Sequence, residues 1–151
     1  AKVFPNLIFH VVGSEDGAID LLKEIEQRSL KNVIFHKYLS KPKLIELLEN
    51  IDLHILLSKS EGFPKVILET SSMGIPSILY PDYGCEEWIV DGKNGFIVDN
   101  ISQAVGVIKK LINNKGLLES VSRQSMKLSK SFDWKVKIKN WEDAFLKLYD
   151  L

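Results

Sequence analysis

The chain has 151 residues, of which 45% are hydrophobic, so it can bury the core of one ordinary domain without disulfides or a structural metal. Its 20 basic and 20 acidic residues cancel to a formal net charge of zero, which argues against a nucleic-acid-binding protein, because such proteins carry a basic patch or stripe. Cys85 is the only cysteine, which excludes an intrachain disulfide and fits a reducing compartment.

Short apolar runs alternate with amphipathic stretches, and this pattern predicts strands that alternate with helices. In chain order, the expected elements are strand 7–12, helix 17–30, strand 33–36, helix 41–50, strand 53–57, helix 64–73, strand 77–80, a short helix 86–90, strand 96–98, and helices 102–113, 117–130 and 134–148. Ser40 is expected to cap its helix, Gly74 to end the helix before it, and residues 91–95 (DGKNG) to form a turn. This order predicts an α/β fold with a Rossmann-like parallel sheet, helices on both faces, and strands buried on both sides.

Chemistry is expected first in the loop that follows strand 53–57, because ligands of such folds bind at the carboxyl ends of the strands. Glu61 lies in this loop, and Glu69 lies more than a turn into the next helix, with GFPKVIL between them. With Pro64 at the first helical position, the N–H groups of Lys65 and Val66 have no partner within the helix. A helix N-terminus attracts phosphate, and Gly62 lets a ligand approach the backbone closely.

The same pattern predicts a phosphate cradle with a carboxylate on each side, which suits a phosphate linked to sugars. From spacing alone, a plain turn followed by a helix with a solvated glutamate is an equal alternative. No cluster with metal-ligand spacing is present in the sequence, and the DGKNG run lacks the further ligands of a calcium loop.

The segment from Ser60 to Val98 strongly resembles the donor-domain motif of the retaining GT-B glycosyltransferases (family GT4, glycosyl transferases group 1). That motif reads E-G-F-x5-E-A-M-A-x-G-x-P-V-I, followed by G-G-x-x-E-I-V-x-D-G-x-N-G-x-L-V. The matching residues are Glu61, Gly62, Phe63, Glu69, Gly74, Pro76, Gly84, Glu87, Asp91, Gly92, Asn94, Gly95 and Val98. Weaker resemblance extends over nearly the whole chain.

The resemblance implies a role for each matched position. Glu61 would contact the transferred sugar as the catalytic-site carboxylate, and Phe63 and Pro64 would border that sugar through their backbone. Lys65 and Val66 would offer N–H groups to the diphosphate. The remaining assignments place Glu69 on the ribose, Gly62 beside the donor, and Tyr38, Leu39 and Ser40 near the base. The family holds the diphosphate without a metal, so no cofactor is expected.

The sequence departs from the family pattern at several points, and one of them is Pro64, which has no N–H and so removes one backbone donor from the sugar site. Thr70, Ser71 and Ser72 replace Ala-Met-Ala, which alters packing, and Tyr83 replaces the first glycine of the Gly-Gly pair, which would narrow the donor pocket. The family's first donor-domain strand and helix, with the Arg and Lys that clamp the diphosphate, have no counterpart here. The acceptor-binding N-terminal domain is absent as well, so residues 1–151 are expected to be one domain of a longer enzyme that binds donor weakly and is inactive alone.

The resemblance predicts an enzyme that transfers a hexose-type sugar from a nucleoside diphosphate to an acceptor hydroxyl, with retention, in surface polysaccharide or glycolipid synthesis. Its expected partners are the nucleotide sugar and the acceptor domain, without nucleic acid. The absence of a signal-peptide pattern and of an apolar run of about 18–20 residues predicts a cytoplasmic location, with peripheral association of the whole enzyme at the inner membrane face as a further option.

Two other functions stay open at this point. One is a nucleotide-sugar epimerase of the same fold, and the other is a non-catalytic α/β binding module such as a flavodoxin-like signalling domain. Such a module needs an acidic phosphorylation pocket or a flavin loop at the strand ends, and Asp52 precedes its strand, which disfavours this alternative. His10, His36, His54 and Cys85 are expected to be structural, with no nucleophile–histidine pair. Trp134, Trp141 and Tyr149 are spaced to face a core or a neighbouring domain.

Overall fold

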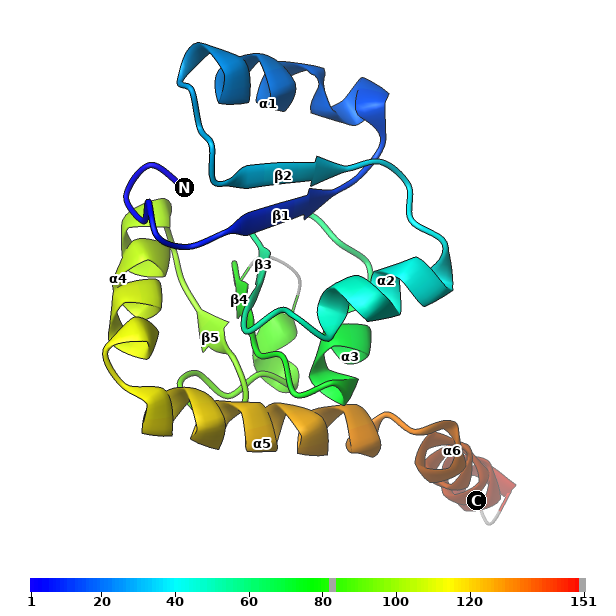
Figure 1. The fold of residues 1–151 in the computed structure, drawn as a ribbon. Coiled ribbons are helices and arrows are strands. Elements are labelled where there is room, and N and C mark those ends of the chain that lie inside the picture. Colours follow the sequence, from blue (N-terminus) through cyan, green and yellow to red (C-terminus); the bar gives the residue numbers. More distant parts are fainter. Residues whose placement is uncertain (82–83, 150–151) are drawn as a thin grey trace. The chain divides into compact units, whose positions relative to one another are not determined.

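A computed structural model describes residues 1–81 and 84–149 (Figure 1). The chain forms two compact units, Ala1–Glu49 and Asn50–Leu151. Every strand pairing within them is parallel, as the alternation of strands and helices predicts. Tyr83, which was expected to narrow a donor pocket, lies outside the described residues.

The first unit holds two strands and two helices: β1 (Phe9–Val12), α1 (Glu15–Gln27), β2 (Val33–His36) and α2 (Lys41–Leu48). Phe9 of β1 stands opposite Val33 of β2 in the parallel register. The side chain of Asn32 ties the segment before β1 to this sheet, because its amide nitrogen donates to the carbonyl oxygens of Phe4 (2.9 Å) and Leu7 (2.8 Å). Asn32 therefore links the turn that leads into β2 to the segment that leads into β1.

The second unit contains a parallel sheet in the order β3-β4-β5 with three of its α-helices around it, while the C-terminal helix extends away from the sheet (Figure 1). Its elements are β3 (His54–Leu56), α3 (Lys65–Ser72), β4 (Ser77–Leu79), the 3-10 turn η1 (Cys85–Glu87), β5 (Phe96–Ile97), α4 (Ile101–Ile112), α5 (Lys115–Ser131) and α6 (Trp134–Tyr149). Helix α5 packs along α3 and also contacts α4. Asn100 and Asn114 cap α4 and α5 by accepting bonds from the N–H groups of Gln103 (3.0 Å) and Leu117 (2.9 Å).

The core of the second unit lies between β4, α3, η1 and α5. Its buried cluster consists of Ile67, Leu79, Cys85, Ile89 and Leu128. All of β4 is buried because it is the central strand of its sheet. Strands β1, β2 and β3 are half-buried or carry exposed residues, whereas Phe96 of β5 is buried. The prediction of burial on both sides is therefore right for β4 and wrong for β1, β2 and β3.

Gly74 ends α3 in the left-handed conformation (φ +77°), as predicted. Several predicted boundaries are wrong, including those of the first helix, which covers Glu15–Gln27 rather than 17–30, and of α5, which covers Lys115–Ser131 rather than 117–130. Pro64 has extended backbone (ψ 95°) and is the N-cap of α3, so the helix begins at Lys65. The predicted helix at 86–90 is the single turn η1, because the side chain of Asn94 bonds the backbone of Trp88 and Val90 and prevents the helix from continuing.

Helix α6 contributes no buried residue to the described part of the chain. Trp134, Trp141 and Tyr149 are 71%, 61% and 87% exposed, so none of them faces a core within this chain. A packing role for them against a neighbouring domain stays a prediction. Among the described residues, no helix combines the length and apolar character needed to cross a membrane.

Candidate functional site

The expected site is built by the loop between β3 and the N-terminus of α3. The first intrahelical bond of α3 runs from the Ile67 N–H to the Pro64 carbonyl oxygen (3.0 Å). The N–H groups of Lys65 and Val66 precede it, and no side chain of residues 1–81 or 84–149 caps this end. The helix therefore presents free donors and the positive end of its dipole, which together suit a phosphate group.

Along the chain, a glutamate lies on each side of this helix end. Glu61 is half-buried in the loop, and Glu69 is exposed one turn into α3. Within the described part of the chain, neither carboxylate makes a side-chain hydrogen bond or an ion pair. Because both are unengaged, they can accept hydrogen bonds from the hydroxyl groups of a bound ligand.

The loop is held in place by the side chain of Phe63. Its ring lies 5.4 Å from the ring of Trp88 and 5.4 Å from the ring of Phe132, centroid to centroid. Although its ring contacts this aromatic cluster, Phe63 remains 44% exposed at the surface of the loop. A Cβ at Gly62 would meet nothing within 4 Å, so the backbone before Phe63 lies open to a ligand.

Residues 91–95 form a turn that the side chains of Asn94 and Asp91 hold by hydrogen bonds to backbone groups. Asn94 Nδ2 donates to the carbonyl oxygen of Trp88 (3.0 Å), and Asn94 Oδ1 accepts from the Val90 N–H (2.8 Å). Asp91 Oδ1 accepts from the Ile97 N–H (3.0 Å). A Cβ at Gly95 would lie 3.1 Å from the carbonyl oxygen of Ser77, so only glycine fits there easily. The predicted turn is confirmed.

Residues 1–128 match the protein family described as "Glycosyl transferases group 1". The chain belongs to this family. It is 32% identical over 114 residues to the Vi polysaccharide biosynthesis protein VipC/TviE of Salmonella typhi, a match that covers 72% of this chain and 20% of that protein. It is 27% identical over 151 residues to the capsular polysaccharide biosynthesis glycosyltransferase CapM of Staphylococcus aureus, which covers 94% of this chain and 39% of CapM.

A solved structure shares the fold of this glycosyl transferases group 1 chain. HepE of Anabaena, determined in complex with UDP-glucose, superposes with a TM-score of 0.77 at 22% sequence identity, covering 97% of this chain and 42% of that one. The predicted α/β fold of GT-B type is confirmed by this likeness. The chain spans less than half the length of the relatives described here.

Of the residues that replace Ala-Met-Ala in the group 1 motif, Thr70 and Ser72 are hydrogen-bonded through their hydroxyl groups. Thr70 is buried, and its hydroxyl donates to the carbonyl oxygen of Val66 at 3.0 Å. The Ser72 hydroxyl donates to the carbonyl oxygen of Glu69 at 2.7 Å. Two of the polar replacements thus bond back to their own helix, in the way that Thr and Ser do inside helices.

The residues expected near the base belong to the first unit, whereas Glu61 and Glu69 belong to the second. Tyr38 is 87% exposed, Leu39 is half-buried, and Ser40 is the N-cap of α2. Ser40 occupies the predicted cap position, but its hydroxyl makes no capping bond. All three lie in the connection between β2 and α2, after the carboxyl end of a parallel strand.

The histidines are engaged within the fold. His54 Nδ1 lies 2.9 Å from the Ser77 hydroxyl, so a serine–histidine pair exists that the sequence did not reveal. Ser77 is only 1% exposed, which prevents it from reaching a substrate, and burial lowers the pKa of His54 to about 4. Nδ1 of His10 and Nε2 of His36 are hydrogen-bonded at 2.8 Å. Burial lowers the pKa of His10, and the neighbouring His36 lowers it further.

Cys85 is buried, and its thiol donates to the carbonyl oxygen of Tyr80 (3.2 Å), which fits the expected structural role. No group of three or more His, Cys, Asp or Glu side chains in residues 1–81 and 84–149 is arranged to hold a metal ion. An open cavity of about 420 Å³ lies elsewhere in the second unit, and neither Glu61 nor Glu69 lines it.

Proposed function

We propose that this chain is the donor-binding domain of a two-domain glycosyltransferase, and that it binds a nucleoside-diphosphate sugar for transfer, with retention, to an acceptor hydroxyl. The observation that carries the proposal is the uncapped N-terminus of α3 between two unengaged carboxylates. Membership of the glycosyl transferases group 1 family supports it. The acceptor would be held by a separate domain of the whole protein.

The roles follow from the chemistry of each group. The N–H groups of Lys65 and Val66 bind the diphosphate at the positive end of α3, where no metal is required. Glu69 accepts hydrogen bonds from the ribose hydroxyls. Glu61 contacts the transferred sugar, with Gly62 and the backbone of Phe63 and Pro64 beside it. The connection Tyr38–Ser40 receives the base.

The named relatives suggest the biological setting. Two of them are named for the biosynthesis of Vi and capsular polysaccharides, and a structural neighbour was solved with UDP-glucose. We therefore propose a hexose donor carried by UDP and a role in surface polysaccharide assembly. In this proposal the whole enzyme acts in the cytoplasm at the inner face of the membrane.

Nucleotide titration of the 15N-labelled chain by NMR tests the donor site. UDP, GDP and ADP are added separately, and UDP is expected to shift amide signals of Tyr38–Ser40 and Glu61–Glu69. Glu69→Ala should weaken binding about tenfold or more, because hydrogen bonds to a charged group contribute about 1.5–3 kcal/mol.

Glu119→Ala is the matched control, because Glu119 is also an exposed glutamate on a helix of the second unit. It should leave the titration unchanged. Equal binding by the wild-type and Glu69→Ala chains would contradict the ribose assignment. A full-length protein that converts nucleotide sugars without transferring them would favour an epimerase instead.

A further inference from the structure

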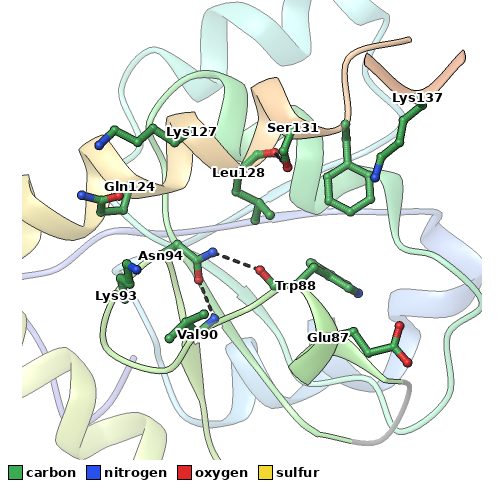
Figure 2. A pocket seen from close by; sticks show the side chains of 11 residues that line it. Glu87, Trp88, Val90, Lys93, Asn94, Gln124, Lys127, Leu128, Ser131 and Lys137 are labelled. Carbon is green, nitrogen blue, oxygen red and sulfur yellow. Dashed lines mark hydrogen bonds between the residues drawn. The ribbon is translucent and has the colours of Figure 1, made fainter. Parts of the chain in front are cut away.

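The cavity of the second unit lies between η1, the turn at residues 91–95, the end of α5 and the first turn of α6 (Figure 2). Its volume of about 420 Å³ falls within the range of small-molecule sites, which is about 300–1,000 Å³. The side chains that matter here are Trp88, Lys93, Gln124, Lys127, Phe132 and Lys137. None of them belongs to the proposed donor site.

The charge of the cavity is unbalanced. Lys93, Lys127 and Lys137 line it, whereas Glu87 is the one carboxylate among its described lining residues. Within residues 1–81 and 84–149, none of these lysines makes an ion pair. The Lys137 ammonium is positioned 4.3 Å from the centroid of the Phe132 ring, so one of the cations is held at the wall (Figure 2). Such a cavity attracts an anion.

The other walls favour a sugar over a bare anion. Trp88 and Phe132 are half-buried aromatic side chains at an edge-to-face angle of 78°, and the apolar C–H faces of sugar rings pack against such rings. Gln124 adds an amide, and the Ser131 hydroxyl, which donates to the carbonyl oxygen of Leu128 (2.7 Å), keeps lone pairs to accept a bond. Aromatic walls with a few polar groups are typical of sites that orient a small ligand.

We propose that this cavity is a second ligand site that binds an acidic saccharide, a short sugar chain carrying a carboxylate or a phosphate group. The anion pairs with a lysine of the wall, Lys127 at one end or Lys137 at the other, and a sugar ring packs against Trp88. The site is independent of the proposed donor function, because none of its residues takes part in donor binding.

The aromatic cluster connects this site to the donor loop. The rings of Trp88 and Phe132, which line the cavity, both contact the ring of Phe63. Phe63 lies in the same loop as Glu61, so a ligand that moves either ring also moves the loop backbone. Binding at the cavity should therefore be visible in the Phe63 amide signal as well as at the cavity itself.

NMR titration of the 151-residue chain with three probes tests the proposal. Trigalacturonic acid supplies carboxylates, glucose 1-phosphate supplies a phosphate, and maltotriose is the neutral control. We expect at least one acidic probe to shift the Trp88 indole signal and the Asn94 and Ser131 amides in a saturable way, with maltotriose at least tenfold weaker. Which acidic probe binds more tightly identifies the anion.

Matched lysine variants complete the test. The double variant Lys127→Gln/Lys137→Gln should weaken binding at least tenfold, whereas Lys109→Gln/Lys110→Gln, which removes two exposed lysines of α4, should leave it unchanged. Equal affinity for maltotriose, unsaturable shifts, or undiminished binding by the cavity variant would overturn the proposal. Shifts confined to Glu61–Glu69 would also overturn it, since they would report binding at the donor site alone.

Discussion

Acid should destabilise the second unit through one imidazole. His54 begins β3, where its Nδ1 meets the Ser77 hydroxyl and its backbone N–H donates to the Pro76 carbonyl oxygen (2.9 Å). Burial lowers its pKa from 6.5 to about 4. The folded chain therefore holds this imidazole neutral at pH values where the unfolded chain would protonate it.

The size of the effect follows from proton linkage. Above pH 6.5 the imidazole is neutral in both states, and the unfolding free energy carries no penalty from it. As the pH falls from about 6.5 to about 4, the unfolded chain binds a proton that the folded chain does not, and stability is lost. At about 1.36 kcal/mol per pH unit, the loss from this group reaches about 3 kcal/mol.

Urea unfolding followed by tryptophan fluorescence measures this loss. All three tryptophans, Trp88, Trp134 and Trp141, lie in the unit that contains His54, so the signal reports on that unit. The wild-type chain and His54→Gln are compared at pH 7.0, 6.0, 5.0 and 4.5. The stability of the variant relative to wild type should rise steadily as the pH falls, because glutamine does not titrate.

His10→Gln is the control, because His10 belongs to the first unit and its pKa is also lowered. It should leave the tryptophan-detected transition of the second unit unchanged at each pH. Parallel curves for wild type and His54→Gln across the whole range would refute the reasoning, since they would show that His54 titrates alike in the folded and unfolded chains.

Three glycine and asparagine variants test other features of the second unit. Gly74→Ala should lower the unfolding free energy by about 1–2 kcal/mol in urea unfolding. Alanine disfavours the left-handed backbone of this position, and its Cβ would lie 2.9 Å from the Ser122 hydroxyl oxygen. A loss below about 0.3 kcal/mol would contradict the assigned conformation. Asn94→Ala should cost about 1–3 kcal/mol in the same assay through two lost hydrogen bonds, whereas Lys93→Ala beside it should change stability by less than about 0.5 kcal/mol. Gly62→Ala should unfold like wild type, because its added methyl group meets only open space in the chain. The same methyl group would stand where a ligand approaches the backbone, so UDP should bind more weakly in NMR titration. Unchanged affinity would show that no ligand approaches there.

The order and type of the elements could be predicted because local patterns determine them. Apolar runs mark the five strands, and the residues at the ends of α2 and α3 mark where those helices begin or stop. The N-terminus of α3 with Glu61 and Glu69 could be found for the same reason, since the loop, the helix start and both carboxylates are neighbours in sequence. The end of η1 could not, because it depends on the amide of Asn94, which folds back on Trp88 and Val90.

Features that join distant segments could not be read from the sequence. His54 meets Ser77 because the parallel register of β3 and β4 places them opposite each other, and no local pattern fixes that register. The cavity needs η1, α5 and α6 to come together in space. The contact of Phe63 with Phe132 likewise depends on how α5 packs, although an aromatic residue in an otherwise polar loop was a signal that something must anchor it.

The turn at residues 91–95 bears on how family resemblance should be interpreted. Asp91, Asn94 and Gly95 match the family motif, yet their side chains or close contacts serve the chain's own backbone. A protein that lost Glu61 and Glu69 would still need this turn to join η1 to β5. Matches confined to the turn would therefore identify relatives that fold alike, whether or not they carry the two carboxylates of the proposed donor site.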